Sequence, residues 1–327
     1  MMDRIARVTR NDFVIVGRAG MDFYPDPPGT KTEEATQFVA CLGGSSANIG
    51  VAITRHGGRA ALVTSVSDDA IGRFCLNELA KYGVDSRHVR SVGGEARNSL
   101  AVVESRVEDH QSVIYRNGAA DFQMTTEDVA AVDYEAYGAL ITTGTVFAAE
   151  PSRGAAFHAF DLARKAGLPL IFDIDYRPYS WPSPDVASEV YSRAGRLCDI
   201  VIGNDDEFGF MAGGKDKGLA KARELAGSTA SIVVYKMGEH GAITITPDEE
   251  FRTGIYPVTA LKPTGAGDAF MGGFVASLAQ GHELRDCVLR GSASAAIVVS
   301  RVGCAPAMPT TAELEAFLAG HPGPTDS

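Results

Sequence analysis

The chain has 327 residues, of which 45% are hydrophobic and 22% charged, with a formal net charge of −11 at pH 7. The negative charge argues against a sequence-independent nucleic-acid binder, which needs a basic face, and no apolar run is long enough to be a signal peptide or to span a bilayer. The five cysteines are widely spaced and form no C-x-x-C pair. We therefore expect a reduced, cytoplasmic protein with no nucleic-acid partner and no membrane partner.

Short apolar segments alternate with helical patterns along the chain. The predicted strands cover residues 13–17, 61–64, 139–142, 170–173, 200–203 and 232–235, and the predicted helices cover residues 46–56, 71–82, 152–166, 186–198, 267–280 and 284–302. Near-continuous apolar strands separated by helices are typical of a mainly parallel sheet with helices on both faces. We therefore predict a single α/β domain over residues 1–327.

Two stretches, residues 24–41 and 99–117, interrupt this alternation with extended segments. No helical pattern separates the segments at 100–106 and 112–116, so we expect a small separate sheet. A small sheet at the carboxyl ends of a parallel sheet is well placed to cover a substrate crevice. The sequence thus predicts a lid, and because exposed strand edges often pair, a homodimer through this lid is plausible. The lid is expected to comprise about residues 22–41 and 98–118.

A glycine turn, Gly265-Ala266-Gly267-Asp268, opens the late apolar helix. The first turn of a helix leaves N–H groups without intrahelical partners, and these groups suit an anion such as a transferring phosphate. Asp268 could accept the proton of an attacking hydroxyl while Gly265, Ala266 and Gly267 supply anion-stabilising N–H groups. The structural alternative is an Asp helix cap followed by glycines that pack against another helix.

Other nucleotide-binding motifs are missing from the sequence. There is no G-x-x-x-x-G-K-[ST], and no G-x-G-x-x-G follows the first predicted strand. The sequence therefore lacks the main motifs that would identify a P-loop ATPase, a protein kinase or a Rossmann dehydrogenase. The seven histidines are scattered without a His/Cys cluster, which argues against a zinc site.

A second glycine motif, Gly43-Gly44-Ser45-Ser46-Ala47-Asn48, opens an early helix. This pair of motifs, in this order, resembles the ribokinase-like carbohydrate kinase family, also called the phosphofructokinase-B type. The resemblance extends over nearly the whole chain and includes Gly17, Asp22, Asn204-Asp-Asp-Glu207, Lys236-Met-Gly238 and Gly241. It implies a ribokinase-like three-layer sandwich with a central mostly parallel sheet, helices on both faces and a small β-sheet lid.

The resemblance also implies an ATP-dependent sugar kinase that uses Mg²⁺. The residues implied to bind the sugar are Asp22, Gly43, Gly44, Asn48 and Asp268, and those implied to bind ATP are Asn204, Lys236, Gly238, Gly241, Gly265 and Gly267. Glu207 is implied to support Mg²⁺, which usually keeps several waters and takes few protein ligands. The structural alternatives are a turn residue for Asp22 and helix-terminal polar groups for Asn48 and Asn204.

Three further residues favour an acidic sugar as the substrate. Arg177 follows a buried strand and could contact phosphate or an anionic substrate, with a surface ion pair as the alternative. Tyr115-Arg116 ends a predicted lid strand and could bind a carboxylate, although exposed lid charge competes with this interpretation. With the family resemblance, they suggest phosphorylation at C6 of a keto-deoxy sugar acid. The expected substrate is 5-dehydro-2-deoxy-D-gluconate from inositol breakdown, and the alternative is 2-dehydro-3-deoxygluconate.

Lys262 departs from the family pattern, because many members have an Asp six residues before the catalytic Asp to help bind a monovalent cation. We expect the Lys262 ammonium to take over that electrostatic role, so that K⁺ is not needed; the alternative is an exposed lysine without a role. Two other classes of function remain open at this stage. One is a catalytically silent sugar-acid sensor, and the other is a nucleoside kinase on the same scaffold.

Overall fold

The structure is a computed structural model that describes residues 5–325. Its strands are β1 Asp12–Val16, β2 Gly20–Pro25, β3 Phe38–Gly43, β4 Arg59–Ser67, β5 Asp85–Val92, β6 Leu100–Val103, β7 Ser112–Tyr115, β8 Ala139–Thr143, β9 Leu170–Asp173, β10 Ile200–Asn204, β11 Ile232–Lys236, β12 Ala242–Ile245 and β13 Glu250–Thr253. Its α-helices are α2 Ser45–Arg55, α3 Ala70–Lys81, α4 Thr126–Ala130, α5 Ser152–Lys165, α6 Pro184–Gly195, α7 Asp205–Ala212, α8 Gly218–Ser228, α9 Ala266–Ala279, α10 Leu284–Val299 and α11 Thr311–Gly320.

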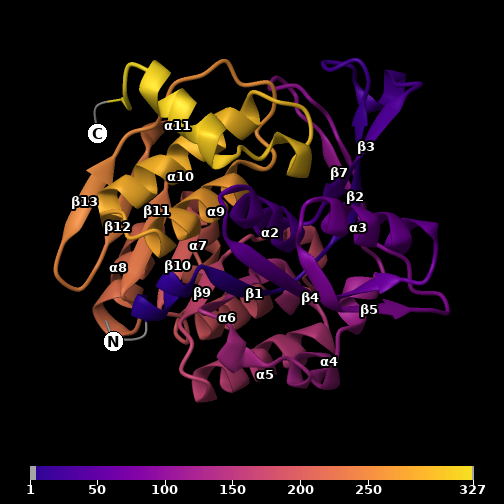
Figure 1. Ribbon diagram of the computed structural model, residues 1–327, viewed down its shortest axis with the longest axis horizontal. Coiled ribbons are helices and arrows are strands. Elements are labelled where there is room, and N and C mark those ends of the chain that lie inside the picture. Colours follow the sequence, from indigo (N-terminus) through magenta and orange to yellow (C-terminus); the bar gives the residue numbers. More distant parts are fainter. Residues whose placement is uncertain (1–4, 326–327) are drawn as a thin grey trace.

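Nine strands form the central sheet in the order β13-β12-β11-β10-β9-β8-β1-β4-β5. All neighbours from β11 to β5 are parallel, and only β12 and β13 join in antiparallel fashion. Helices α2, α3, α9 and α10 cover one face, whereas α4, α5 and α6 cover the other (Figure 1). The predicted α/β architecture is confirmed.

Alternation along each strand explains why both faces are covered. In β1, Phe13 and Ile15 pack into the core beneath α2 and α9, while Val14 and Val16 pack into the opposite core against the α5 side. Successive side chains of a strand point to opposite faces, so a strand that is apolar throughout must be buried on both. The near-continuous apolar runs in the sequence therefore indicate strands that are covered on both faces of the sheet.

The order of the strands determines where a site can form. β1 lies between β4 and β8, so the chain first extends the sheet in one direction and later in the other. In open α/β sheets, ligands bind at the carboxyl ends of the strands beside such a reversal. The residues that follow β1, β8, β9, β10 and β11 therefore meet at one edge of the sheet.

A separate four-stranded sheet has the order β3-β2-β6-β7 and stands at one end of the molecule (Figure 1). The predicted small sheet is thereby confirmed. Its inner face contributes Tyr24, Ala101 and Val103 to a small apolar cluster that also contains Cys304. Its outer face exposes Phe38, Val113 and Tyr115.

The six predicted helices all exist, with ends that differ by up to three residues from those expected. Helices α4, α7, α8 and α11 and strands β5, β12 and β13 were not predicted. α7 begins directly after β10 with Asn204 as its cap, a role considered for this residue although the helix itself was not predicted. No helix within residues 5–325 is long and apolar enough to cross a membrane.

Candidate active site

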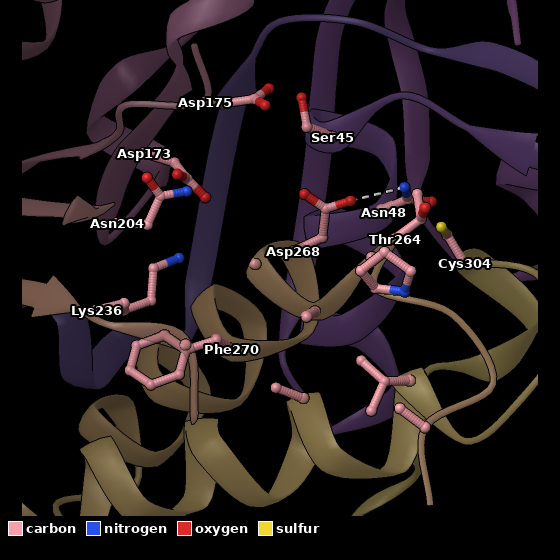
Figure 2. Close-up of a pocket in the computed structure, with 18 of the residues that line it drawn as sticks. Ser45, Asn48, Asp173, Asp175, Asn204, Lys236, Thr264, Asp268, Phe270 and Cys304 are labelled. Atoms are coloured by element: carbon pink, nitrogen blue, oxygen red, sulfur yellow. Dashed lines mark hydrogen bonds between the residues drawn. The ribbon is translucent and has the colours of Figure 1, made fainter. Parts of the chain in front are cut away.

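A cavity of about 1000 Å³ lies between the carboxyl ends of the central strands, the start of α9 and the inner face of the small sheet (Figure 2). Thirteen of the predicted site residues line it: Asp22, Gly44, Asn48, Arg177, Asn204, Glu207, Lys236, Gly238, Gly241, Gly265, Ala266, Gly267 and Asp268. They come from segments far apart in the sequence, so the fold brings the two glycine motifs to one place.

The late glycine turn has the geometry of an anion site. Gly265 is the N-cap of α9 with a φ of +88°, a left-handed conformation that favours glycine. The N–H of Ala269 makes the first intrahelical bond, to the Gly265 carbonyl at 3.0 Å. The N–H groups of Ala266, Gly267 and Asp268 therefore have no intrahelical acceptor and lie on the cavity.

Asp268 is a half-buried carboxylate in the first turn of α9, and it accepts a hydrogen bond from Asn48 Nδ2 at 2.8 Å (Figure 2). Burial and the negative charge of Asp175 raise the pKa of Asp268 to about 7, against the opposing effects of Asn48, Arg177 and Lys236. A general base works best when its pKa lies near the working pH. Asp268 can therefore both take up and release a proton near neutrality.

The early glycine pair creates room for polar groups beside Asp268. A Cβ at Gly43 would lie 2.0 Å from Asp22 Oδ1, and one at Gly44, where φ is +91°, would lie 2.5 Å from the Arg18 carbonyl oxygen. Gly43 itself does not line the cavity but allows Asp22 to do so. Burial raises the pKa of Asp22 to about 6. Asn48 Oδ1 is buried without a hydrogen-bond partner among the described residues, so it is available to accept a bond from a ligand hydroxyl.

The segment after β9 supplies an ion pair to the same side of the cavity. Arg177 Nη2 lies 2.8 Å from Asp175 Oδ1, and this charge raises the pKa of Arg177. Burial would raise the pKa of Asp175, but Arg177, the Ser45 hydroxyl, Arg18 and Arg116 together hold this pKa below its ordinary value. Asp175 has a φ of +38°, a conformation rare outside glycine that is often retained at functional sites.

Glu207 and Asn204 form a capping box at the start of α7. Asn204 Oδ1 accepts from the Glu207 N–H at 2.8 Å, and Glu207 Oε2 accepts from the Asn204 N–H at 2.7 Å. The structural interpretation of Asn204 as a helix cap is therefore confirmed, and both residues still line the cavity. Each carboxylate oxygen has a second lone pair, so the cap leaves Glu207 able to bind a cation or its waters.

Asp173 and Lys236 lie to one side of Asp268 (Figure 2), and Glu207 lines the same cavity. Burial raises the pKa of Asp173 and of Glu207, and Lys236 opposes both rises. Lys236 Nζ lies 3.5 Å from the position a Cβ would take at Gly267. Within residues 5–325 no cluster of three or more acidic, His or Cys side chains could hold a metal ion. Two buried carboxylates that line one cavity nevertheless suit Mg²⁺, which retains most of its waters.

The structure corrects the placement of Tyr115 and Arg116, neither of which lines the cavity. Alternation along β7 turns Ile114 toward the cavity and Tyr115 outward, where 61% of Tyr115 is exposed. Arg116 is buried, but it is bound by Asp121, donates to the Thr145 carbonyl at 2.9 Å and so has a structural partner. The expected contact of these two residues with a substrate carboxylate is therefore not supported.

Lys262 is fully buried, so its interpretation as an exposed lysine without a role was wrong. Its ammonium donates to the carbonyls of Thr264 and Val298, beneath the glycine turn. Burial lowers the pKa of Lys262, whereas nearby acidic groups, including Asp268, act against this. That this ammonium replaces a monovalent ion stays a prediction.

Two features of the site were not predicted. Arg18, which follows β1, lines the cavity, and its position directly after the first strand was the available signal in the sequence. In the small sheet, His110 Nε2 lies 3.3 Å from Thr264 Oγ1, so the loop between β6 and β7 contacts the segment that leads to the glycine turn. His110 and Thr264 are 154 positions apart in the chain, so no local sequence pattern could predict their contact.

A doubly covered parallel sheet, an Asp in the first turn of a helix behind a glycine turn, and a small sheet over the cavity define a phosphotransferase of the carbohydrate kinase class. The chain belongs to the pfkB family of carbohydrate kinases, whose profile matches residues 10–311. The predicted family is thus confirmed.

Curated relatives named 5-dehydro-2-deoxygluconokinase align with nearly the whole chain. The protein from Photobacterium profundum is 37% identical over 312 residues, which are 94% of each chain. The protein from Geobacillus kaustophilus is 34% identical over 95% of this chain and 94% of its own. The names of these relatives agree with the substrate expected from the sequence.

Solved structures of sugar kinases share the fold. A fructokinase from Vibrio cholerae, solved with fructose, ADP and calcium, has a TM-score of 0.82 and 27% identity, covering 94% of this chain and 99% of its own. A putative ribokinase II from E. coli, solved with ATP and Mg²⁺, has a TM-score of 0.84 at 20% identity, covering 95% and 99%. The second likeness establishes the fold alone.

Proposed function

We propose that the protein transfers the γ-phosphoryl group of ATP to the C6 hydroxyl of 5-dehydro-2-deoxy-D-gluconate, in inositol catabolism. The observation that carries the chemistry is Asp268, a half-buried carboxylate with a pKa raised to about 7 at the start of α9. The choice of substrate is supported by the names of the relatives that align over the full chain. Two arginines, Arg18 and Arg177, line the cavity and suit an acidic sugar.

In this reaction the C6 oxygen attacks the γ-phosphorus, the bond to the leaving ADP oxygen breaks, and Asp268 accepts the hydroxyl proton. The N–H groups of Ala266 and Gly267, two residues that line the cavity without an intrahelical acceptor, would stabilise the charge on the phosphoryl oxygens. Asn48 keeps Asp268 oriented and offers its free Oδ1 to a sugar hydroxyl. Asp22 is a further acceptor for the hydroxyls of the sugar.

ATP is assigned to the side of the cavity that contains Lys236, Gly238 and Gly241. Lys236 lies close to Gly267 and can pair with the phosphates. Asp173 and Glu207 would hold Mg²⁺ and its waters, and the ion would neutralise charge on the phosphate oxygens. Asn204 lies in the same group, with its side-chain oxygen engaged in the helix cap.

We also propose that the four-stranded sheet acts as a lid and that two copies pair through its outer face. The exposed side chains of Phe38, Val113 and Tyr115 support this pairing, because apolar side chains gathered on one face mark contact sites. Location in the cytoplasm remains a prediction, supported by five cysteines that are all buried and free.

The test is ATP consumption with Mg²⁺ against a panel of 5-dehydro-2-deoxygluconate, 2-dehydro-3-deoxygluconate, ribose, fructose and adenosine. A preference for the first, measured as kcat/KM, is the expected result. A preference for another member would overturn the proposed substrate but keep a kinase, and adenosine would indicate a nucleoside kinase. Binding of sugar acid without any ATP turnover would indicate the sensor instead.

A further inference from the structure

Arg18, the second residue after β1, is a buried cation whose donors are only partly used. Its side chain lines the cavity, 7% of the residue is exposed, and Nη1 donates to the Ser99 hydroxyl at 3.0 Å. Its Nε is buried and has no hydrogen-bond partner in the described part of the chain. The N–H of Ala47 donates to the Arg18 carbonyl at 3.2 Å, which fixes the backbone against α2. Arg18 is therefore fixed in position, and its Nε–H is a hydrogen-bond donor without an acceptor among the described residues.

Two other arginines near this end of the cavity already have acidic partners. Arg116 is paired with Asp121, and Arg177 is paired with Asp175. Among residues 5–325, no carboxylate lies within ion-pair distance of Arg18. Burying an unpaired guanidinium is costly, and a ligand carboxylate would remove this cost with two parallel hydrogen bonds. Arg18 has the charge and the geometry for such a ligand group.

The position of Arg18 fits the far end of a sugar acid. In Figure 2, Asp173 and Asn204 lie between Asp175 and Lys236, so these two residues mark opposite ends of the polar group beside Asp268. Arg18 lies on the Asp175 side of the cavity, because its positive charge lowers the pKa of Asp175. The same charge is the largest effect that opposes the burial-induced rise in the pKa of Asp22. A substrate with its C6 hydroxyl at Asp268 and ATP on the Lys236 side must extend its carboxylate toward the Asp175 side.

We propose that Arg18 binds the carboxylate of the substrate through Nε and an adjacent Nη, and so makes the enzyme prefer sugar acids to neutral sugars. This inference rests on the proposed function as a sugar-acid kinase. It gives Arg18 the role that Tyr115 and Arg116 were expected to share. Ser99, which precedes β6 of the lid, holds the other end of the guanidinium, so the carboxylate site joins the central sheet to the lid.

The experiment compares 5-dehydro-2-deoxygluconate with the analogue in which the carboxylate is reduced to a hydroxymethyl group. Arg18→Gln should lower kcat/KM for the acid about 10- to 100-fold, mainly through KM, because bonds to a charged group are lost. The loss with the neutral analogue should be much smaller, so the preference for the acid should collapse. Arg18→Lys, which keeps the charge without the planar fork, should retain part of the preference. Arg97→Gln, an exposed change two residues from Ser99, is the matched control.

Each outcome separates this inference from the proposed function. If the wild-type enzyme does not prefer the acid, both the proposed substrate and the role of Arg18 fail. If the wild-type enzyme prefers the acid and the two Arg18 variants keep that preference, only the role of Arg18 fails. An equal loss with both substrates would mean that Arg18 is structural, and thermal unfolding of each variant identifies a folding defect. Selective loss with the acid supports the inference.

Discussion

Asn48 Nδ2 donates to Asp268 Oδ2 at 2.8 Å and thereby links helices α2 and α9 across 220 positions of the chain. The two glycine motifs therefore form one unit, in which the early motif orients the base that the late motif presents. The hydrogen bond also favours the ionised form of Asp268, since it lowers a pKa that burial raises.

Asp268→Asn should abolish most of the activity while keeping the shape of the site. Because the amide cannot accept the hydroxyl proton, we expect kcat to fall about 10²- to 10⁴-fold. The measurement is ADP release at saturating ATP and sugar acid. Asp216→Asn, at an exposed position, serves as the control and should be unchanged. Turnover of Asp268→Asn close to that of the wild type would refute the role of Asp268 as a base.

Activity should fall as the pH drops through the pKa of Asp268. Below about pH 7 the carboxyl is protonated and cannot accept a proton, so kcat/KM should fall about tenfold for each further pH unit. Asn48→Ala removes a hydrogen bond that lowers this pKa, so its acid limb should lie at higher pH than that of the wild type. Arg55→Ala, at the other end of α2, should not move the limb. A shift to lower pH in Asn48→Ala would contradict the assignment.

The wild-type enzyme should need Mg²⁺ but show little response to K⁺, because the Lys262 ammonium already binds the carbonyls of Thr264 and Val298. Lys262→Ala empties this position and should lower the initial rate. Added K⁺ or ethylammonium should then restore part of the rate, whereas Lys217→Ala, an exposed lysine, should behave like the wild type. Strong stimulation of the wild type by K⁺ would show that Lys262 does not replace the ion.

Val113→Lys should separate the proposed dimer into monomers. Val113 is 45% exposed on the outer face of β7, and a charge there would have to be buried between two copies. Light scattering after size exclusion gives the mass directly. Val107→Lys, which is 57% exposed but lies outside the strands, should leave the mass unchanged. A wild-type protein that is monomeric at high concentration would contradict pairing through the lid.

The sequence predicted the parts of the fold that depend on local patterns. Apolar strands, helical periodicity and glycine stops located six strands and six helices, because each signal lies within a short window. The cluster around Asp268 was also predicted, since its two motifs resemble those of a known family. The prediction that Arg116 faces the substrate was wrong because its ion pair with Asp121 forms only in the folded chain and has no signal in the sequence. The burial of Lys262 likewise depends on Val298, which lies 36 positions away.

The capping box of α7 makes one carboxylate serve two purposes. Burial raises the pKa of both Glu207 and Asp268, so each charge costs the fold. Glu207 lines the cavity and offsets this cost by accepting a backbone N–H that caps α7, whereas the start of α9 has no side-chain cap and Asp268 makes no such contribution. Variants selected for stability alone should therefore keep Glu or Gln at 207 and readily lose the acid at 268. Drift under relaxed selection would thus erase the catalytic base first and leave the neighbouring helix intact.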